Sequence, residues 1–131
     1  MKDVPTVILL SLAALSCYVE PKVHVEGCNP PQFTFSSNTV TTTLFVSRIP
    51  PESRNRMIPI EFFSKDNPNT YWMIDGKHDQ VNPIAYRKVP EGMREVIAAK
   101  PLVEGENYFV FVASLVGRSF VIEGGCAKED R

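Results

Sequence analysis

The residues whose types and spacing most favour chemistry lie in one short stretch, Asp75-Gly76-Lys77-His78-Asp79. Carboxylate oxygens and imidazole nitrogens bind divalent cations, so Asp75, His78 and Asp79 are the candidate ligands of a cation held in a loop. Asp and Gly also favour turns, and a solvated polar loop over residues 75–82 explains the same composition. A pattern within a single loop is a weak motif, so we prefer the loop interpretation and expect no metal and no cofactor.

Other patterns typical of enzymes are missing from the sequence. The chain has two histidines, His24 and His78, and it has no Gly-x-Ser-x-Gly, His-Glu-x-x-His, phosphate-binding Gly-rich or Cys-x-x-Cys pattern. Its formal net charge of −1 argues against nucleic acid as a partner, because phosphate binding needs a concentrated basic surface. The sequence therefore favours a non-catalytic protein with no catalytic residue, and a metal-dependent enzyme is the least favoured hypothesis.

Aromatic side chains give a second kind of candidate site. Phe63, Tyr71, Trp72 and Tyr86 lie close together in the sequence. Neighbouring residues of a strand point to opposite faces, so one of Tyr71 and Trp72 is expected to face outward. An exposed ring can stack on a sugar, which makes Tyr71, Trp72 and Tyr86 the candidate binding residues of an envelope carbohydrate-binding module. Burial of these rings in the core is the alternative, and it is the commoner use of aromatic residues.

The N-terminus reads as a targeting segment. The apolar run over residues 7–15 is far shorter than the roughly 20 residues that span a bilayer as a helix. It ends in Ala14-Leu15-Ser16-Cys17, which resembles the lipobox of bacterial lipoproteins, in which the cysteine after the cleavage site is lipid-modified. The resemblance implies a signal peptide over residues 1–16 and a lipid on Cys17. Residues 17–27 would then be a tether, and an extra edge strand over residues 18–26 is the alternative. A plain secretory signal cut after Ser16, or a buried N-terminal segment, are the alternatives.

The cysteine count agrees with export. The chain has three cysteines, and lipidation of Cys17 leaves Cys28 and Cys126 as a pair. Exported proteins meet an oxidising environment, in which such a pair can form a disulfide. A bridge that closes a loop of about 100 residues stabilises a fold by about 4.7 kcal/mol in the chain-entropy model.

These residues have to be positioned by strands, because the periodicity of the chain is that of an all-β protein. The clearest signal is residues 107–114, where Tyr108, Val110 and Val112 fall on one face. Seven or eight short strands separated by turns, with no convincing long helix, predict a β-sandwich over residues 28–126, followed by a polar tail over 127–131. The expected strands cover residues 32–36, 39–49, 58–63, 70–74, 84–89, 107–114 and 119–123, with 93–100 suited to either a strand or a short helix.

The spacing of residues over 102–112 indicates a particular type of β-sandwich. Leu102 lies six residues before Tyr108, with Gly105 in the turn between them, and Val110 and Val112 follow. This spacing resembles the penultimate strand of fibronectin type III domains, and it implies a tyrosine corner in which the Tyr108 hydroxyl meets the backbone. Trp72 lies on a later strand, which is closer to the immunoglobulin arrangement. We therefore expect an immunoglobulin-like sandwich. In fibronectin-like topology, the ends that hold Cys28 and Cys126 lie at opposite poles unless flanking segments fold back.

The whole chain has a further resemblance. Together with the signal segment, Trp72-Met73-Ile74, the run over residues 86–92 and Pro101-Leu102 resemble small uncharacterised lipoproteins of Gram-negative bacteria. This implies a location in the cell envelope, facing the periplasm or the exterior, and no activity. The expected function is a membrane-anchored binding or structural domain, with a protein or glycan of the envelope as its partner.

Overall fold

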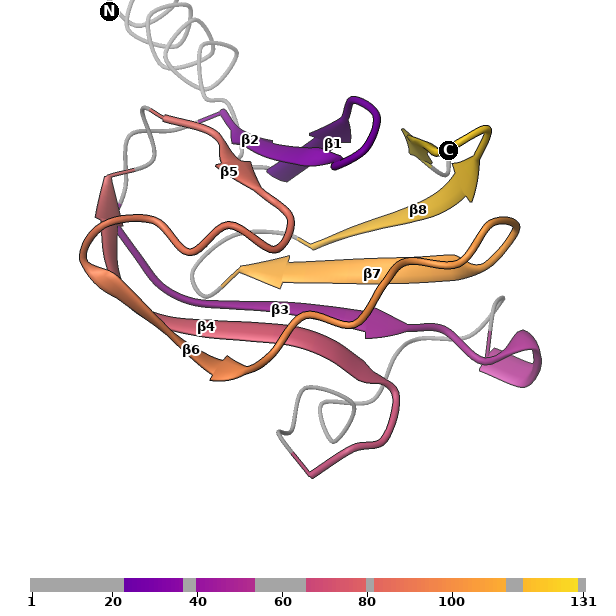
Figure 1. Ribbon diagram of the computed structural model, residues 1–131, viewed down its shortest axis with the longest axis horizontal. Coiled ribbons are helices and arrows are strands. Elements are labelled where there is room, and N and C mark those ends of the chain that lie inside the picture. The colour runs from indigo at the N-terminus through magenta and orange to yellow at the C-terminus, as the bar shows by residue number, and fades with distance from the viewer. Residues whose placement is uncertain (1–22, 37–39, 54–65, 80–81, 113–116, 130–131) are drawn as a thin grey trace, which may run out of the picture.

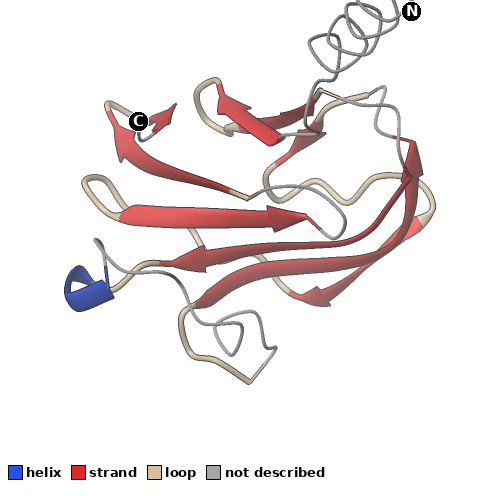
Figure 2. Ribbon diagram, turned by 180° about the vertical axis from the view of Figure 1, so that it is seen from behind, coloured by secondary structure: helices blue, strands red, loops and turns tan. Residues whose placement is uncertain are grey.

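The computed structural model describes residues 23–36, 40–53, 66–79, 82–112 and 117–129 (Figure 1). These residues form nine strands and one turn of 3-10 helix, η1 (Pro51–Ser53), the blue segment of Figure 2. The strands are β1 (Val23–Glu26), β2 (Gln32–Phe35), β3 (Val40–Arg48), β4 (Thr70–Asp79), β5 (Ile84–Ala85), β6 (Met93–Ile97), β7 (Asn107–Val112), β8 (Arg118–Glu123) and β9 (Cys126–Glu129). Within these ranges, no helix has the length and apolar character needed to cross a bilayer.

The strands form two antiparallel sheets, as the all-β prediction requires. The smaller sheet has the order β1-β2-β5, and the larger has the order β6-β4-β3-β7-β8-β9. Figure 1 shows the smaller sheet lying against the upper part of the larger one, with the long β6–β7 connection crossing in front of β3 and β7. The predicted all-β fold with two layered sheets is confirmed, but the described residues form nine strands where seven or eight were expected.

The core lies between the two sheets, and β7 contributes the face that its sequence predicts. Tyr108, Val110 and Val112 are fully buried, because alternate residues of a strand point to the same side. Aromatic rings connect the layers: the centroids of Phe33 and Phe120 lie 6.2 Å apart in an edge-to-face arrangement. The other large buried side chains of the core are Leu44, Val46, Trp72, Ile74, Ile84 and Tyr86.

Both ends of the described chain are more ordered than the sequence suggested. Residues 23–26, which we assigned to a tether, form β1, and residues 127–129, assigned to a polar tail, belong to β9. Glu129 connects these strands, because its Oε1 accepts the backbone N–H of Val25 at 3.0 Å and lies 3.3 Å from Nε of Arg118. The two sheets are therefore closed against each other at this edge.

Three further expectations need correction or refinement. The polar loop predicted over residues 75–82 is wrong, because β4 continues through Asp79 and pairs with β3 up to Val40. The strand predicted over 84–89 is only the two residues of β5, and the ambiguous segment 93–100 contains strand β6. The strand expected over 58–63 lies outside the described residues.

A β-bulge changes the direction of one side chain in β4. Trp72 lies opposite Val46, but Thr70 lies opposite Ser47, so Tyr71 is an extra residue in the ladder. The strict alternation that we used for Tyr71 and Trp72 is therefore broken. Trp72 is buried in the core, and Tyr71 packs against the same core as a half-buried side chain.

Candidate functional site

The candidate cation ligands lie on strand β4, and the Asp75 and His78 side chains contact different partners. The Asp75 carboxylate lies 3.9 Å from the guanidinium of Arg94, and Nε2 of His78 lies 2.9 Å from the carbonyl oxygen of Asn82. Asp79 is the last residue of β4. In the part of the chain that the structure describes, no three His, Cys, Asp or Glu side chains are grouped so that they could hold a metal ion.

Two of the three candidate sugar-binding rings are inside the protein. Trp72 is 0 % exposed and Tyr86 is 2 % exposed, and their ring centroids lie 5.2 Å apart at an interplanar angle of 66°. The indole N–H of Trp72 donates a 2.8 Å hydrogen bond to the Glu95 carboxylate. Tyr71 stacks edge-on against Tyr108 with its centroid 5.1 Å away. Trp72 and Tyr86 therefore offer no ring face to a sugar, and Phe63 lies outside the described residues.

The cysteine pair is joined as predicted. Cys28 and Cys126 form a disulfide with an S–S distance of 2.02 Å, and they lie in or beside the β1–β2 and β8–β9 turns. Two backbone hydrogen bonds flank it, from the Asn29 N–H to the Gly125 oxygen at 3.2 Å and from the Ala127 N–H to the Gly27 oxygen at 3.0 Å. The cysteines meet because β1 and β9 fold back at either end of the chain. Cys17, the expected lipidation site, lies outside the described residues.

The turn before β7 makes the contact expected of a tyrosine corner. The Tyr108 hydroxyl accepts a 2.8 Å hydrogen bond from the backbone N–H of Val103. Leu102 packs against the core, and Gly105 has a φ of 82°, which a side chain would adopt only with strain. Burial raises the pKa of the Tyr108 phenol. This corner holds residues 101–105 against the sheet, and those residues form one wall of a surface pocket.

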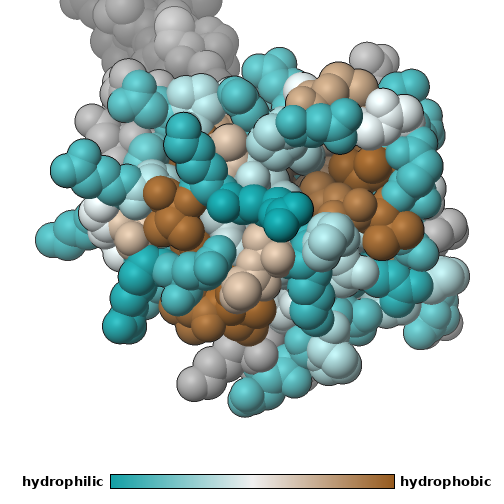
Figure 3. All heavy atoms as spheres, viewed as in Figure 1, coloured by the Kyte–Doolittle hydropathy of each residue, from teal (hydrophilic) through white to brown (hydrophobic). Residues whose placement is uncertain are grey.

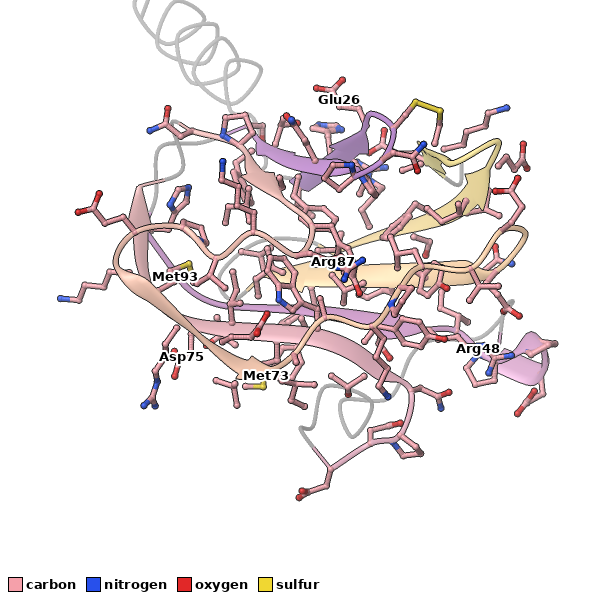
Figure 4. The ribbon with its side chains drawn as sticks, in the orientation of Figure 1. Glu26, Arg48, Met73, Asp75, Arg87 and Met93 are labelled. Carbon is pink, nitrogen blue, oxygen red and sulfur yellow. A yellow bond between two sulfur atoms is a disulfide. The ribbon has the colours of Figure 1, made fainter. Side chains whose placement is uncertain are left out.

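The pocket, which we call the Arg87 pocket, has a volume of about 550 Å³. It is built from the β1–β2 turn, the turn after β5, the segment before β7 and the end of β8. Its lining residues are Asn29, Pro30, Pro31, Tyr86, Arg87, Pro101, Leu102, Glu104, Ile122 and Gly125. Figure 4 labels Arg87 at the centre of the face turned to the viewer, and Figure 3 shows that apolar side chains gather on either side of a hydrophilic band on this face.

Hydrogen bonds fix the walls of the pocket to one another. The Tyr86 N–H donates to the Pro31 oxygen at 2.9 Å, and the Tyr86 hydroxyl donates to the Lys100 oxygen at 2.6 Å. Burial raises the pKa of this phenol, so it remains a neutral donor at physiological pH. The Glu104 carboxylate accepts the N–H groups of Gly124 and Gly125, which ties the segment before β7 to the β8–β9 turn. These hydrogen bonds hold together the turns that form the pocket.

Arg87 occupies an unusual backbone conformation at the edge of the pocket. Its φ is 74°, in a turn closed by a 3.1 Å hydrogen bond from the Lys88 N–H to the Ala85 oxygen. Asn29, on the opposite wall, has a φ of 41°. Among the described residues, these two are the non-glycine positions with positive φ, and both line the same pocket. Such conformations cost free energy and tend to cluster where a ligand is held.

The electrostatics of the pocket leave one cation available. The Glu104 carboxylate accepts hydrogen bonds from two backbone amides, and these bonds lower the pKa of its carboxyl group and keep it anionic. Arg87 donates no hydrogen bond and forms no ion pair within the described ranges. Its guanidinium is exposed to solvent beside apolar proline and leucine side chains. The arrangement is suited to binding an anionic group attached to an apolar body.

Sequence reasoning missed this pocket. Arg87, Asn29 and Glu104 were not among the candidate binding residues, because none belongs to a motif. No sequence signal was present, because Tyr86-Arg87-Lys88 lacks the glycine that usually indicates a positive φ. The strain at Arg87 is visible only in the three-dimensional structure.

Comparisons with known proteins identify no relative of this chain. No protein-family model, curated protein or solved structure matches the chain. The interpretation of the pocket therefore depends on its own geometry.

Proposed function

We propose that the protein is a lipid-anchored protein of the bacterial cell envelope whose immunoglobulin-like domain binds a partner and has no catalytic activity. The observation that carries the proposal is the Cys28–Cys126 disulfide, which joins residues 98 positions apart. Structural disulfides persist mainly in oxidising compartments, so the bond supports export. It also leaves Cys17, which follows the lipobox-like residues, as the one cysteine without a disulfide partner.

The immunoglobulin-like part of the proposal draws on the architecture. Two antiparallel sheets enclose one core, and the Tyr108 hydroxyl bonds to the backbone of the preceding turn. This scaffold holds turns from distant parts of the sequence side by side. The Arg87 pocket is the surface at which such turns meet, and its residues are suited to binding rather than to proton transfer or nucleophilic attack.

A lipid on Cys17 would keep the domain close to the bilayer. Residues 18–22 separate Cys17 from the start of β1 at Val23. A chain of this length spans at most about 20 Å when fully extended. The β1–β2 turn, which contributes Asn29 and Pro30 to the pocket, lies at the other end of β1. The pocket therefore lies at the end of β1 that is farther from the attachment point.

The proposal is tested by metabolic labelling of a Gram-negative host with an alkyne-bearing fatty acid. The wild-type protein should be tagged and should sediment with membranes, and Cys17→Ser should be untagged. Ser11→Ala, within the same apolar run, is a matched control that should leave the tag unchanged. An untagged, soluble wild-type protein would remove the anchor from the proposal.

Thiol counting separates lipidation from plain secretion. In the unreduced, denatured protein, lipidation of Cys17 and the Cys28–Cys126 disulfide should leave no thiol for an alkylating reagent. Plain secretion would leave the Cys17 thiol free, and intact mass would show a single adduct. Cys28→Ser/Cys126→Ser should also lose stability, by about 4–5 kcal/mol in the chain-entropy model, in urea unfolding.

A further inference from the structure

We propose that the Arg87 pocket binds the free C-terminal carboxylate of a peptide whose last side chain is apolar. The inference deepens the proposed function, because it names the ligand class of the binding domain. It rests on the proposal that the domain binds a partner, and it does not require the lipid anchor.

The conformation of Arg87 is the first argument. The turn over residues 85–88 places a positive φ at its third position, where glycine is the unstrained choice. Arginine at that position is disfavoured by contact between its Cβ and the backbone. No described residue accepts a hydrogen bond from this side chain, so no hydrogen bond within the described fold offsets the strain of its backbone. The strain is explained if the guanidinium binds something outside the chain.

The chemistry of the guanidinium indicates a carboxylate. Arginine presents a planar pair of N–H donors that matches the two oxygens of a carboxylate. Arg87 is the only cationic residue among those that line the pocket, and Lys88, beside it in sequence, is not one of them. A single cation suits a singly charged group better than a phosphate, which usually meets several cations or a helix N-terminus.

The walls indicate what the carboxylate is attached to. Pro30, Pro31, Pro101, Leu102 and Ile122 give the pocket apolar sides. Its volume of about 550 Å³ falls within the roughly 300–1,000 Å³ of small-ligand sites. This space suits the end of a chain rather than a large flat protein surface. An apolar terminal side chain would bury against the prolines, and the carboxylate would remain at the cationic edge.

Asn29 favours a peptide over a fatty acid. Its side-chain amide packs over Gly125, since a Cβ there would come within 2.8 Å of the amide nitrogen. The amide has no hydrogen-bond partner among the described residues, so it offers one donor and one acceptor group to the pocket. A peptide bond next to the terminal residue supplies the complementary pair, whereas an acyl chain supplies neither.

The site is held ready for such a ligand. The Cys28–Cys126 disulfide fixes Asn29 beside Gly125, and the Tyr86 hydroxyl fixes the Arg87 turn to residue 100. Preorganisation of this kind reduces the entropy that a binding site loses when a ligand arrives. A small pocket can therefore bind a short peptide end selectively.

The test uses the purified full-length protein in detergent and an array of acetylated tetrapeptides that vary the last residue. Each peptide is presented with a free C-terminal carboxylate and, as its matched partner, with a C-terminal amide. We expect binding to carboxylate peptides that end in apolar residues, and at least about tenfold weaker binding to their amides, as for loss of a charge-assisted hydrogen bond.

Variants assign the effect to Arg87. Arg87→Gly suits the positive φ and keeps the turn, so it should fold normally and bind carboxylate peptides no better than amides. Lys88→Gln removes the neighbouring charge and should leave the tenfold preference intact. Equal binding of carboxylates and amides by the wild-type protein, or an unchanged preference in Arg87→Gly, would overturn the proposal. Octanoate competing as strongly as the free tripeptide acetyl-Ala-Ala-Leu would also overturn it, in favour of a fatty-acid site.

Discussion

The Tyr86 hydroxyl lies 2.6 Å from the carbonyl oxygen of Lys100 and donates a hydrogen bond to it. The same hydroxyl lies 3.3 Å from the carbonyl oxygen of Tyr71, at the bulge in β4. Tyr86 precedes Arg87, and Lys100 precedes Pro101, so this single side chain fixes two walls of the Arg87 pocket to each other and to the larger sheet.

Tyr86→Phe tests this contact. The substitution keeps the ring, which packs on Trp72, and leaves the Lys100 carbonyl without its donor. The free energy of unfolding should fall by about 1 kcal/mol, as for the loss of one buried hydrogen bond. Tyr86→Leu also removes the ring and should cost more than Tyr86→Phe. Urea unfolding measures both, and an unchanged midpoint for Tyr86→Phe would show that the hydroxyl does not hold the pocket wall.

The buried phenols predict instability at alkaline pH. Burial raises the pKa of Tyr86 and of Tyr108 above the ordinary value of 10.0. Above pH 10 the unfolded chain releases these protons while the folded protein keeps them, so stability is fully present below that pH and falls above it. The expected slope is about 1.4 kcal/mol per pH unit for each tyrosine. Urea unfolding at a series of pH values measures this, and Tyr86→Phe should reduce the slope; a slope that does not change would contradict burial as its cause.

Tyr108→Phe tests the corner before β7. The Val103 N–H would lose its acceptor, and the free energy of unfolding should fall by about 0.5–1.5 kcal/mol. Amide hydrogen exchange reports on the Val103 N–H itself, whereas the free energy of unfolding reports on the whole fold. The Val103 amide should be protected in the wild-type protein and should exchange faster in Tyr108→Phe, relative to the Val110 amide in β7 as an internal reference. Equal exchange in the two proteins would rule out the hydroxyl as the acceptor.

The parts of the fold that follow from local alternation were predictable. Tyr108, Val110 and Val112 lie two residues apart in an apolar run, and their burial follows from the pleat of a strand. The Cys28–Cys126 pair followed from the odd number of cysteines together with the assignment of Cys17 to lipidation. Both predictions depend on residue type and spacing, which the sequence states directly.

The parts that depend on partner strands were not predictable. The bulge at Tyr71 exists because β4 pairs with β3 in a shifted register. The sequence of β4 alone does not indicate where that shift falls. Residues 75–79 form a strand despite turn-forming Asp and Gly, since pairing with β3 and β6 outweighs local preference. The positive φ of Arg87 is likewise invisible, because it arises where a turn is fixed between two sheets.

Arg87→Gly should stabilise the protein even though it removes a side chain. Glycine adopts a φ of 74° without the Cβ contact, which removes a strain of about 1–2 kcal/mol. Glycine also loses more backbone entropy on folding than other residues, at a cost of about 0.5–1 kcal/mol. We expect a net increase of about 0.5–1 kcal/mol in the free energy of unfolding. Lys88→Gly is the matched control at a position without positive φ, and it should destabilise the protein instead. A loss of stability in Arg87→Gly would mean that the guanidinium supports the fold rather than a ligand.

The most direct test of the pocket is an NMR titration of the isotope-labelled full-length protein with acetyl-Ala-Ala-Leu. If the Arg87 pocket captures the free carboxylate, the amide signals of Asn29, Arg87, Leu102 and Gly125 should shift together and saturate. The C-terminal amide of the same peptide should shift these signals only at concentrations at least about tenfold higher. Absence of shifts at these residues, or shifts concentrated on β4 and β6 at the far edge of the larger sheet, would contradict this account.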